Sequence, residues 1–60
     1  MMQIRYDPEA DVLVWVLNDS PPIEATAEPG GLIVSYGEDG EVVTIEWLNA
    51  SRKIDLNHRR

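Results

Sequence analysis

The chain has no cysteine and a single histidine, and these two shortages exclude several classes of protein. Without cysteine there is no disulfide, no thiolate nucleophile, and no Cys-ligated zinc or iron–sulfur site. The one histidine, His58, cannot form a His-rich metal site by itself. A domain of 60 residues buries only about 60% of the surface that its unfolded chain exposes. Oligomerisation is therefore the remaining route to stability, because disulfides and such metal sites are excluded.

Basic residues are scarce outside the C-terminal end. Residues 1–51 carry ten Asp and Glu against Arg5 alone, a net charge of −9, whereas residues 52–60 carry +3, which together give −6. An acidic body disfavours binding to nucleic acid through phosphates, and it favours either a basic partner or simple solubility. The basic tail could contact nucleic acid or an acidic neighbouring subunit, but packing against its own acidic body is the simpler interpretation.

Long apolar runs and targeting signals are missing as well. No segment is long and apolar enough to span a bilayer, and no signal or transit peptide is recognisable. Together with the absence of cysteine, this leads us to expect a cytoplasmic prokaryotic protein. We expect one domain over residues 1–60, with 53–60 as a frayed tail.

The stretch 36–42 predicts the turn of a β-hairpin. An Asp-Gly pair there separates two runs rich in β-branched residues, 32–36 and 42–48, which is the strongest short-range hairpin signal. A two-residue Asp-Gly loop places the large apolar residues on one face by pairing Tyr36 with Val43, Val34 with Ile45, and Leu32 with Trp47. A three-residue loop would set Val34 against Thr44 and Leu32 against Glu46. We therefore predict the first register, or a four-residue loop of the same parity.

A second hairpin is predicted at the start of the chain. Residues 2–6 alternate between apolar and polar, 7–11 form a Pro-containing turn, and 12–17 form the second strand. The register that keeps the large residues together pairs Tyr6 with Leu13, Ile4 with Trp15, and Met2 with Leu17. Both hairpins then present an apolar side to a common core, which would include Trp15 and Trp47. Stacking of these two rings on nucleic acid bases is disfavoured by the acidic body.

The other side of the strand 12–17 is also apolar, although a one-sided antiparallel sheet should be polar there. Monomers rarely leave large apolar patches in water, so we expect a helix, a loop or another subunit to cover this side. The predicted interface consists of Val12, Val14, Val16, Ile33 and Val42.

The remaining segments complete a small sheet. Residues 18–22 form a loop with two prolines, 23–28 alternate as a short edge strand or extended segment, and 29–31 form a turn. Asn49 is the expected N-cap of a short helical turn over 50–54. The fold class is therefore mainly β (α+β), a small antiparallel β-meander of four to five strands with a short C-terminal helical turn.

Two stretches of this chain carry a resemblance to a known family. They are Tyr6-Asp7-Pro8-Glu9-Ala10-Asp11 and Glu46-Trp47-Leu48-Asn49-Ala50-Ser51, supported by Gly31–Val34, Glu38–Gly40, Val43 and Ile45. The chain resembles the prokaryotic domain-of-unknown-function family number twenty-two eighty-three over residues 1 to about 53. This resemblance implies a small antiparallel sheet with a C-terminal helical turn and no established enzymatic activity. It also suggests an antitoxin role, because some members are reported beside small toxin genes. The family is often more polar than this chain at Val14 and Val16.

The acidic residues offer two candidate sites, and each has a simpler explanation. Asp7, Glu9 and Asp11 have the spacing that begins a calcium loop, but Val12 and Asn18 occupy the positions that require Gly and a bidentate Glu. Turn formation and solvated charge explain these three carboxylates. Paired carboxylates for hydrolysis could come from Asp19, Glu24, Glu28 and Glu46, but a 60-residue sheet offers little cleft.

Glu46 stands out among these acids because apolar residues surround it in the sequence. It either pairs across the sheet with Arg5, meets the tail, or belongs to a subunit contact. Ser51 and His58 lack a third member of a catalytic triad, and Ser51 is better explained as a local cap. The Pro29-Gly30-Gly31 turn lacks the Lys and the long helix of a phosphate loop.

We therefore predict no catalytic, cofactor-binding or metal site. The leading hypothesis is a non-enzymatic interaction domain that forms a homo-oligomer, most simply a dimer. It would act as an antitoxin-like partner of a basic protein such as a small ribonuclease toxin, without membrane or nucleic acid. The alternative is a small hydrolase or ligand-binding module with an acidic site at a subunit interface, built from Glu46, Asp7 or Glu24. A third hypothesis is a purely structural accessory domain.

Overall fold

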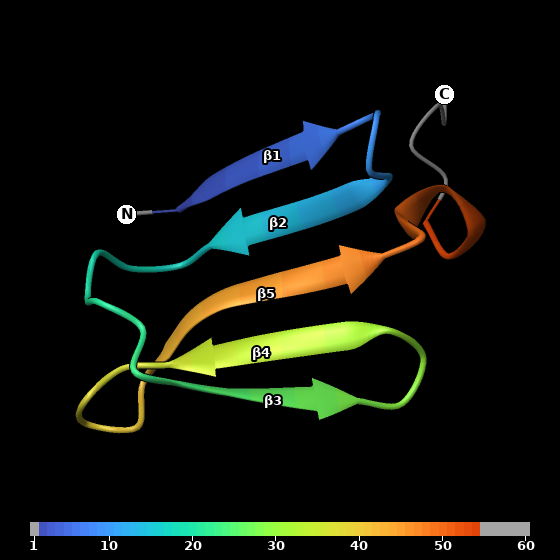
Figure 1. Cartoon of the computed structure of the whole chain (residues 1–60). Helices are drawn as coiled ribbons and strands as arrows, with labels where there is room; N and C mark the ends of the chain where they lie inside the picture. Colours follow the sequence, from blue (N-terminus) through green and yellow to red (C-terminus); the bar gives the residue numbers. More distant parts are fainter. Residues whose placement is uncertain (1, 55–60) are drawn as a thin grey trace.

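The computed structural model describes residues 2–54, which form five β-strands and one short 3-10 helix (Figure 1). The elements in chain order are β1 (Gln3–Asp7), β2 (Val12–Val16), β3 (Glu24–Glu28), β4 (Leu32–Tyr36), β5 (Val42–Leu48) and the 3-10 helix η1 (Ala50–Arg52). All paired strands are antiparallel. The predicted mainly-β antiparallel sheet with a short C-terminal helical turn is thus confirmed.

The order of the strands in the sheet is β1-β2-β5-β4-β3, which departs from a simple meander. The last strand, β5, lies in the centre, between β2 and β4 (Figure 1). Strands β3, β4 and β5 follow one another through hairpins, and β2 is joined to β3 by a longer connection yet lies beside β5. This arrangement of β2 to β5 is a Greek key, to which β1 adds an edge strand.

The first hairpin has the predicted register. Tyr6 pairs with Leu13, and Ile4 pairs with Trp15. The same alternation continues into β5, where Leu13 lies opposite Trp47 and Trp15 lies opposite Ile45. The large apolar residues of both hairpins therefore share one face of the sheet, as the sequence pattern indicates.

Most strand pairs of the central hairpin are as predicted, but the loop that joins its two strands is different. Val34 pairs with Ile45 and Leu32 with Trp47, as predicted, but Tyr36 pairs with Val42 and not with Val43. The amide of Gly37 donates to the carbonyl of Glu41 (2.8 Å), which encloses a three-residue loop, Glu38–Gly40. A register shift between Ser35 and Tyr36 then adds one residue to β5 and restores the parity. The two-residue loop is therefore wrong, and a β-bulge at Val43 explains why the remaining pairs are right.

Residues 24–28 of the segment 23–28, predicted as a short edge strand or extended segment, form an edge strand. Strand β3 pairs with β4 alone, and all five of its residues are exposed. Strand β1 forms the opposite edge, and its residues are exposed too.

No second layer covers either face of this sheet within residues 2–54 (Figure 1). The buried apolar residues there are Leu13, Val43 and Ala50, whereas Ile4 is 57% exposed. Trp15 and Trp47, expected in a common core, are only half-buried. The two rings share one face of the sheet, as predicted, and a single sheet supplies only one of the two layers that a core requires.

The C-terminal turn is shorter than predicted and begins differently. Helix η1 ends at Arg52, and the amide of Ile54 still donates to the carbonyl of Ala50 (2.8 Å). Asn49 occupies the N-cap position but is left-handed (φ 55°) and makes no side-chain capping bond, so its predicted capping role is wrong. The predicted frayed tail lies mostly in 55–60, outside the described residues. Among residues 2–54, no helix is long and apolar enough to cross a membrane.

Candidate interaction surfaces

One face of the sheet, which we call the aromatic face, carries the large apolar side chains. Because directly paired residues project to the same side of a sheet, the ladders define its members. The aromatic face consists of Ile4, Tyr6, Leu13, Trp15, Leu32, Val34, Tyr36, Ile45 and Trp47, with Glu24, Thr26 and Glu28 at the β3 edge. The two tryptophan rings meet at its centre in an edge-to-face arrangement, with their centroids 5.1 Å apart. This geometry is favourable for aromatic pairs and orders the middle of the face.

The opposite face, which we call the valine face, mixes apolar and polar side chains. Its apolar members are Val12, Val14, Val16, Ile33 and Leu48, and its central polar members are Ser35, Thr44 and Glu46. Four of the five residues predicted as an interface lie on this face and are half-buried. The fifth, Val42, lies opposite Tyr36 at the bulge, so its pairing does not assign it to the valine face. The sheet therefore brings Val12, Val14, Val16 and Ile33 together on one surface.

Glu46 occupies the middle of the valine face, between Val14 and Ile33. Arg5, one of the alternatives predicted for Glu46, lies in the same cross-strand row on β1, but Val14 stands between them and the Arg5 guanidinium donates to Oε1 of Gln3 (3.1 Å). Glu24 pairs with Tyr36 at the far edge, opposite the edge that holds Asp7. The structure therefore does not gather Glu46, Asp7 and Glu24 into one site.

A cluster that sequence reasoning missed joins the first hairpin to η1. The Tyr6 hydroxyl donates to Oδ1 of Asp11 (2.7 Å), while Ser51 donates its amide to Oδ1 (3.0 Å) and its hydroxyl to Oδ2 (2.8 Å). The Ala50 amide also donates to the Asp11 carbonyl (3.0 Å). We call Tyr6, Asp11 and Ser51 the clasp. Ser51 thus donates hydrogen bonds to Asp11, and it is not the local cap that its position suggests.

The clasp shifts the protonation of two of its members. Hydrogen bonds from Tyr6 and then from Ser51 lower the pKa of the Asp11 carboxyl, because they favour its charged form. The same Tyr6–Asp11 bond raises the pKa of the Tyr6 hydroxyl, because loss of its proton would place a negative charge beside the carboxylate. A carboxylate held by three donors is a structural acceptor, which explains its position without a reaction.

The turn that resembles the start of a calcium loop uses its carboxylates locally. Oδ1 of Asp7 accepts hydrogen bonds from the amides of Glu9 (3.0 Å) and Ala10 (3.3 Å), and Asp11 belongs to the clasp. No group of three or more His, Cys, Asp or Glu is arranged to hold a metal ion in the part of the chain that the structure describes. Turn geometry therefore explains the position of Asp7, and the clasp explains that of Asp11.

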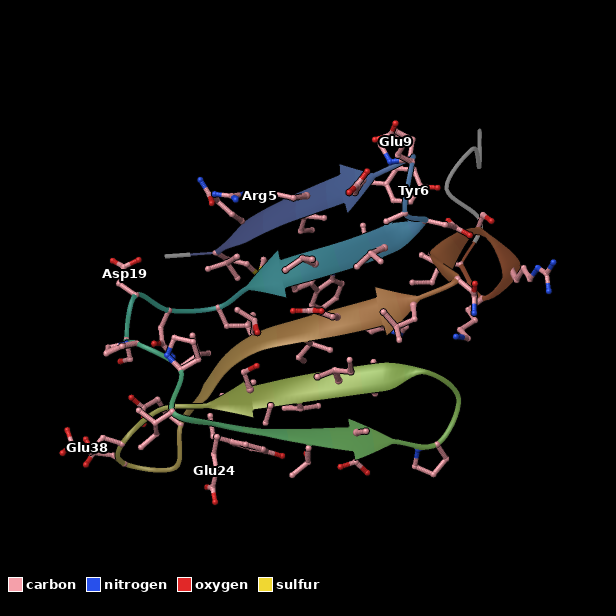
Figure 2. All side chains as sticks on the ribbon, in the orientation of Figure 1. Arg5, Tyr6, Glu9, Asp19, Glu24 and Glu38 are labelled. Carbon is pink, nitrogen blue, oxygen red and sulfur yellow. The ribbon has the colours of Figure 1, made fainter. Side chains whose placement is uncertain are left out.

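The loops around the sheet are strongly acidic. Figure 2 shows Glu9, Asp19 and Glu38 projecting from three separate loops. A pocket of about 350 Å³ lies between the β2–β3 and β4–β5 connections and is lined by Ser20, Pro21, Ile23, Glu38, Asp39 and Glu41. The amide of Glu41 itself, the Ser20 hydroxyl and the Asp39 amide lower the pKa of the Glu41 carboxyl. These hydrogen bonds favour the charged form of Glu41.

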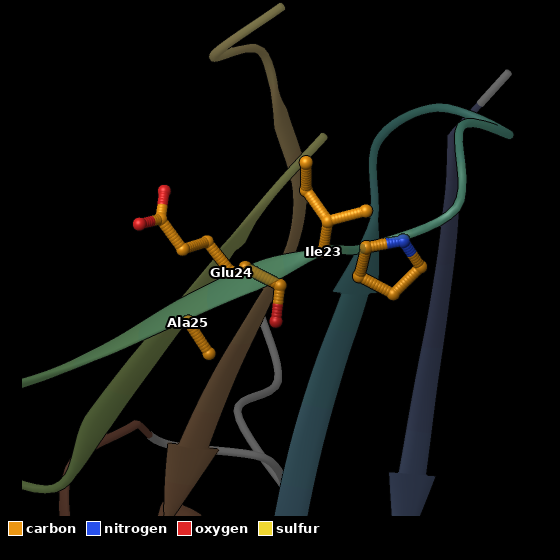
Figure 3. A pocket seen from close by; sticks show the side chains of 5 residues that line it. Ile23, Glu24 and Ala25 are labelled. Carbon is orange, nitrogen blue, oxygen red and sulfur yellow. The ribbon is translucent and has the colours of Figure 1, made fainter. Parts of the chain in front are cut away.

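A second, smaller hollow of about 190 Å³ lies at the start of β3. It is lined by Pro22, Ile23, Glu24, Ala25 and Ser35, and Figure 3 shows Ile23, Glu24 and Ala25 around it. Ile23 is 63% exposed. One carboxylate and one hydroxyl on an open strand edge do not form a catalytic arrangement.

Comparison with known proteins gives one match. Residues 3–51 match a family described as protein of unknown function, DUF2283. The chain belongs to this family. No curated protein and no solved structure matches the chain significantly. The two stretches that carry the DUF2283 resemblance, Tyr6–Asp11 and Glu46–Ser51, meet in the structure at the clasp. The hydrogen bonds of the clasp thus hold these two stretches of the DUF2283 chain together.

Proposed function

We propose that this DUF2283 protein is a non-enzymatic protein-interaction domain that works as a homo-oligomer, most simply a dimer. The observation that carries the proposal is a five-stranded sheet whose two faces both hold apolar side chains and both lack a covering layer within residues 2–54. Since a sheet face must be buried against another layer to form a core, a second polypeptide would supply the layer that residues 2–54 do not provide.

The surface charge supports a basic partner in addition to the second copy. Residues 1–51 carry a net charge of −9, and acidic side chains surround the sheet (Figure 2). Such a field attracts basic proteins and repels nucleic acid phosphates. An antitoxin-like role in the cytoplasm, in which the acidic surface masks a small basic toxin such as a ribonuclease, fits this charge. The hydrolase alternative has less support, because Glu46, Asp7 and Glu24 are spread over the sheet.

The oligomeric state tests the first part of this proposal. Sedimentation velocity of the full chain over a dilution series should give a mass above that of one chain, falling towards one chain as the concentration decreases. A compact, folded single chain at every concentration would overturn the proposal.

Co-expression tests the basic partner separately. The chain is produced together with the product of an adjacent gene that encodes a small basic protein, and the mixture is analysed by size exclusion. A stable complex that weakens as salt is added is the expected result. Separate elution at low salt would remove the antitoxin-like role while leaving the homo-oligomer intact.

A further inference from the structure

The two faces of the sheet differ in what a partner would have to bury. On the aromatic face, two cross-strand rows run over β2, β5 and β4, and all six of their residues are apolar. They are Leu13, Trp47 and Leu32 in one row and Trp15, Ile45 and Val34 in the next. Polar side chains on this face stand at the β3 edge, where Thr26 donates to Glu28 (3.1 Å). A partner on this face would meet an apolar centre with a polar rim, which is the usual composition of a protein interface.

The valine face has the reverse arrangement. Its middle row runs Arg5, Val14, Glu46, Ile33 and Ala27, so a carboxylate stands at the centre of the face. The neighbouring row places Thr44 and Ser35 beside it. Burying a carboxylate without a matched cation is costly, because the charge loses its hydration. The valine face is therefore the poorer surface for an interface between identical chains.

The size of the sheet favours a second copy of the chain as the occupant of the aromatic face. Strands spaced about 4.8 Å apart, with about five residues rising 3.4 Å each, give this face a flat footprint of about 24 by 17 Å, to which projecting side chains add area. A stable interface buries about 800 Å² of accessible surface on each partner. Only a partner that covers the whole face approaches this area. A second copy presents an apolar face of matching dimensions, and two sheets pack face to face at about 10 Å.

The charges at the β3 edge select one of the two simple two-fold arrangements. Glu24 and Glu28 lie on the aromatic side of β3, whereas the β1 edge has uncharged Ile4 and Tyr6 there. A two-fold axis across the strands would place β3 over the β3 of the second copy and bring like charges together. An axis along the strands places β3 over the β1 of the second copy, which avoids this repulsion. The central strand β5 then lies beside the axis.

We propose that two copies of this chain pack through their aromatic faces as a two-sheet sandwich, with β3 of each copy over β1 of the other. This inference rests on the proposed homo-oligomer and specifies its surface and its symmetry. Trp15 and Trp47 lie inside the sandwich, and the valine face with Glu46 remains outside, available to other proteins.

Tryptophan accessibility tests the choice of face without any substitution. Trp15 and Trp47 share the aromatic face, and they are the two tryptophans of the chain. Acrylamide quenching of their fluorescence is measured on the full chain at a concentration where sedimentation shows the oligomer. Strong protection is expected. Quenching close to that of free tryptophan in the intact oligomer would overturn this inference and leave the homo-oligomer standing, whereas the absence of an oligomer would overturn both.

Two matched substitutions test the faces in turn. Ile45→Asp places a charge at the centre of the aromatic face, and Val14→Asp places one on the valine face beside Glu46, on the adjacent strand. We expect Ile45→Asp to lose the oligomeric mass, whether as folded monomer or as unfolded chain, and Val14→Asp to keep it. An Ile45→Asp protein with the wild-type mass would overturn the inference. If both variants lose the oligomer, the quenching result on the wild-type chain decides.

The symmetry can be tested by spin labelling. Because the chain has no cysteine, one introduced cysteine is the single site that a thiol-reactive label modifies. Thr26→Cys on β3 carries one nitroxide spin label. With β3 over β1, the two labelled backbones lie about 20 Å apart, across four strand spacings and one sheet spacing. With β3 over β3 they lie about 10 Å apart, which broadens the spectrum strongly. A resolved dipolar distance near the larger value is expected, and strong broadening would overturn the proposed axis.

Discussion

The hydroxyl of Tyr6 donates a 2.7 Å hydrogen bond to Oδ1 of Asp11, and through that carboxylate the first hairpin holds Ser51 of η1. A helix of three residues cannot be stable alone. The hydrogen bonds of the clasp fix η1 against the first hairpin, and Ala50 of η1 is fully buried. The end of the sheet near the β1–β2 turn is therefore held by polar contacts, while no layer formed by residues 2–54 covers either face.

Replacing Asp11 should loosen η1. Asp11→Asn keeps a side chain that tolerates the left-handed backbone found there (φ 58°) but removes the charge that three donors share. We expect a lower melting temperature and faster trypsin cleavage after Arg52 and Lys53, followed by mass spectrometry. Tyr6→Phe, which removes one of the three donors, should have a smaller effect in the same direction. Unchanged cleavage in Asp11→Asn would show that η1 is held by packing alone.

The clasp should also make stability fall in acid. The folded chain lowers the pKa of Asp11 below its ordinary 3.8, so the folded state favours the ionised form. This contribution is fully present above the unfolded pKa and is lost as the pH falls through the folded pKa. Melting temperatures of wild type and Asp11→Asn should therefore converge below pH 3.8. A constant difference between them throughout the acid range would contradict the assignment to this carboxylate.

At alkaline pH the clasp should make stability fall as the pH rises. The folded chain raises the pKa of Tyr6 above its ordinary 10.0, so the folded state favours the protonated hydroxyl. That contribution is complete below the unfolded pKa and disappears as the pH rises through the folded pKa. Tyr6→Phe should remove this part of the alkaline loss, as measured by chemical denaturation at several pH values. An identical alkaline profile in the variant would assign the loss to other groups.

Alternation of side chains predicted much of the fold, because a one-residue slip moves a whole strand to the wrong face. It gave the Tyr6–Leu13, Ile4–Trp15 and Val34–Ile45 pairs correctly. It could not distinguish a two-residue loop from a three-residue loop followed by a bulge, since both have the same parity beyond Ser35. Tyr36 alone differs between the two, and local sequence contains no further signal for that position.

Long-range features were harder to predict than local ones. The bond between Ser51 and Asp11 joins residues 40 positions apart, and no local pattern indicates it. The central place of β5 was also not predicted, because hairpin signals identify neighbours in sequence and not the strand that returns from a distance. Asn49 and Ser51 suggested caps by residue type, and the contact from Asp11 accounts for Ser51 instead. The apolar second side of the strand 12–17 was predicted from the sequence, whereas the lack of a covering layer over either face within residues 2–54 was not.

The three-residue loop requires glycine at its third position. Gly40 has φ of +80°, a conformation that a Cβ disfavours by about 1–2 kcal/mol. Nothing lies within 4 Å of a Cβ built there, so the cost of Gly40→Ala is conformational and not a clash. We expect a loss of that size in urea denaturation, with a smaller loss for Gly40→Asn. Equal stability of Gly40→Ala and wild type would argue against this loop.

Glu46 should limit the assembly to one pair of sheets. Its carboxylate interrupts an apolar surface formed by Val12, Val14, Val16, Ile33 and Leu48. Glu46→Leu would make the centre of the valine face continuous and apolar, so that sandwiches could stack through their outer faces. We expect light scattering to show species larger than the wild-type oligomer, increasing with concentration. Glu46→Gln removes the charge but keeps a polar group, and it should retain the wild-type mass. If Glu46→Leu also keeps that mass, the valine face is either already covered or too small to associate.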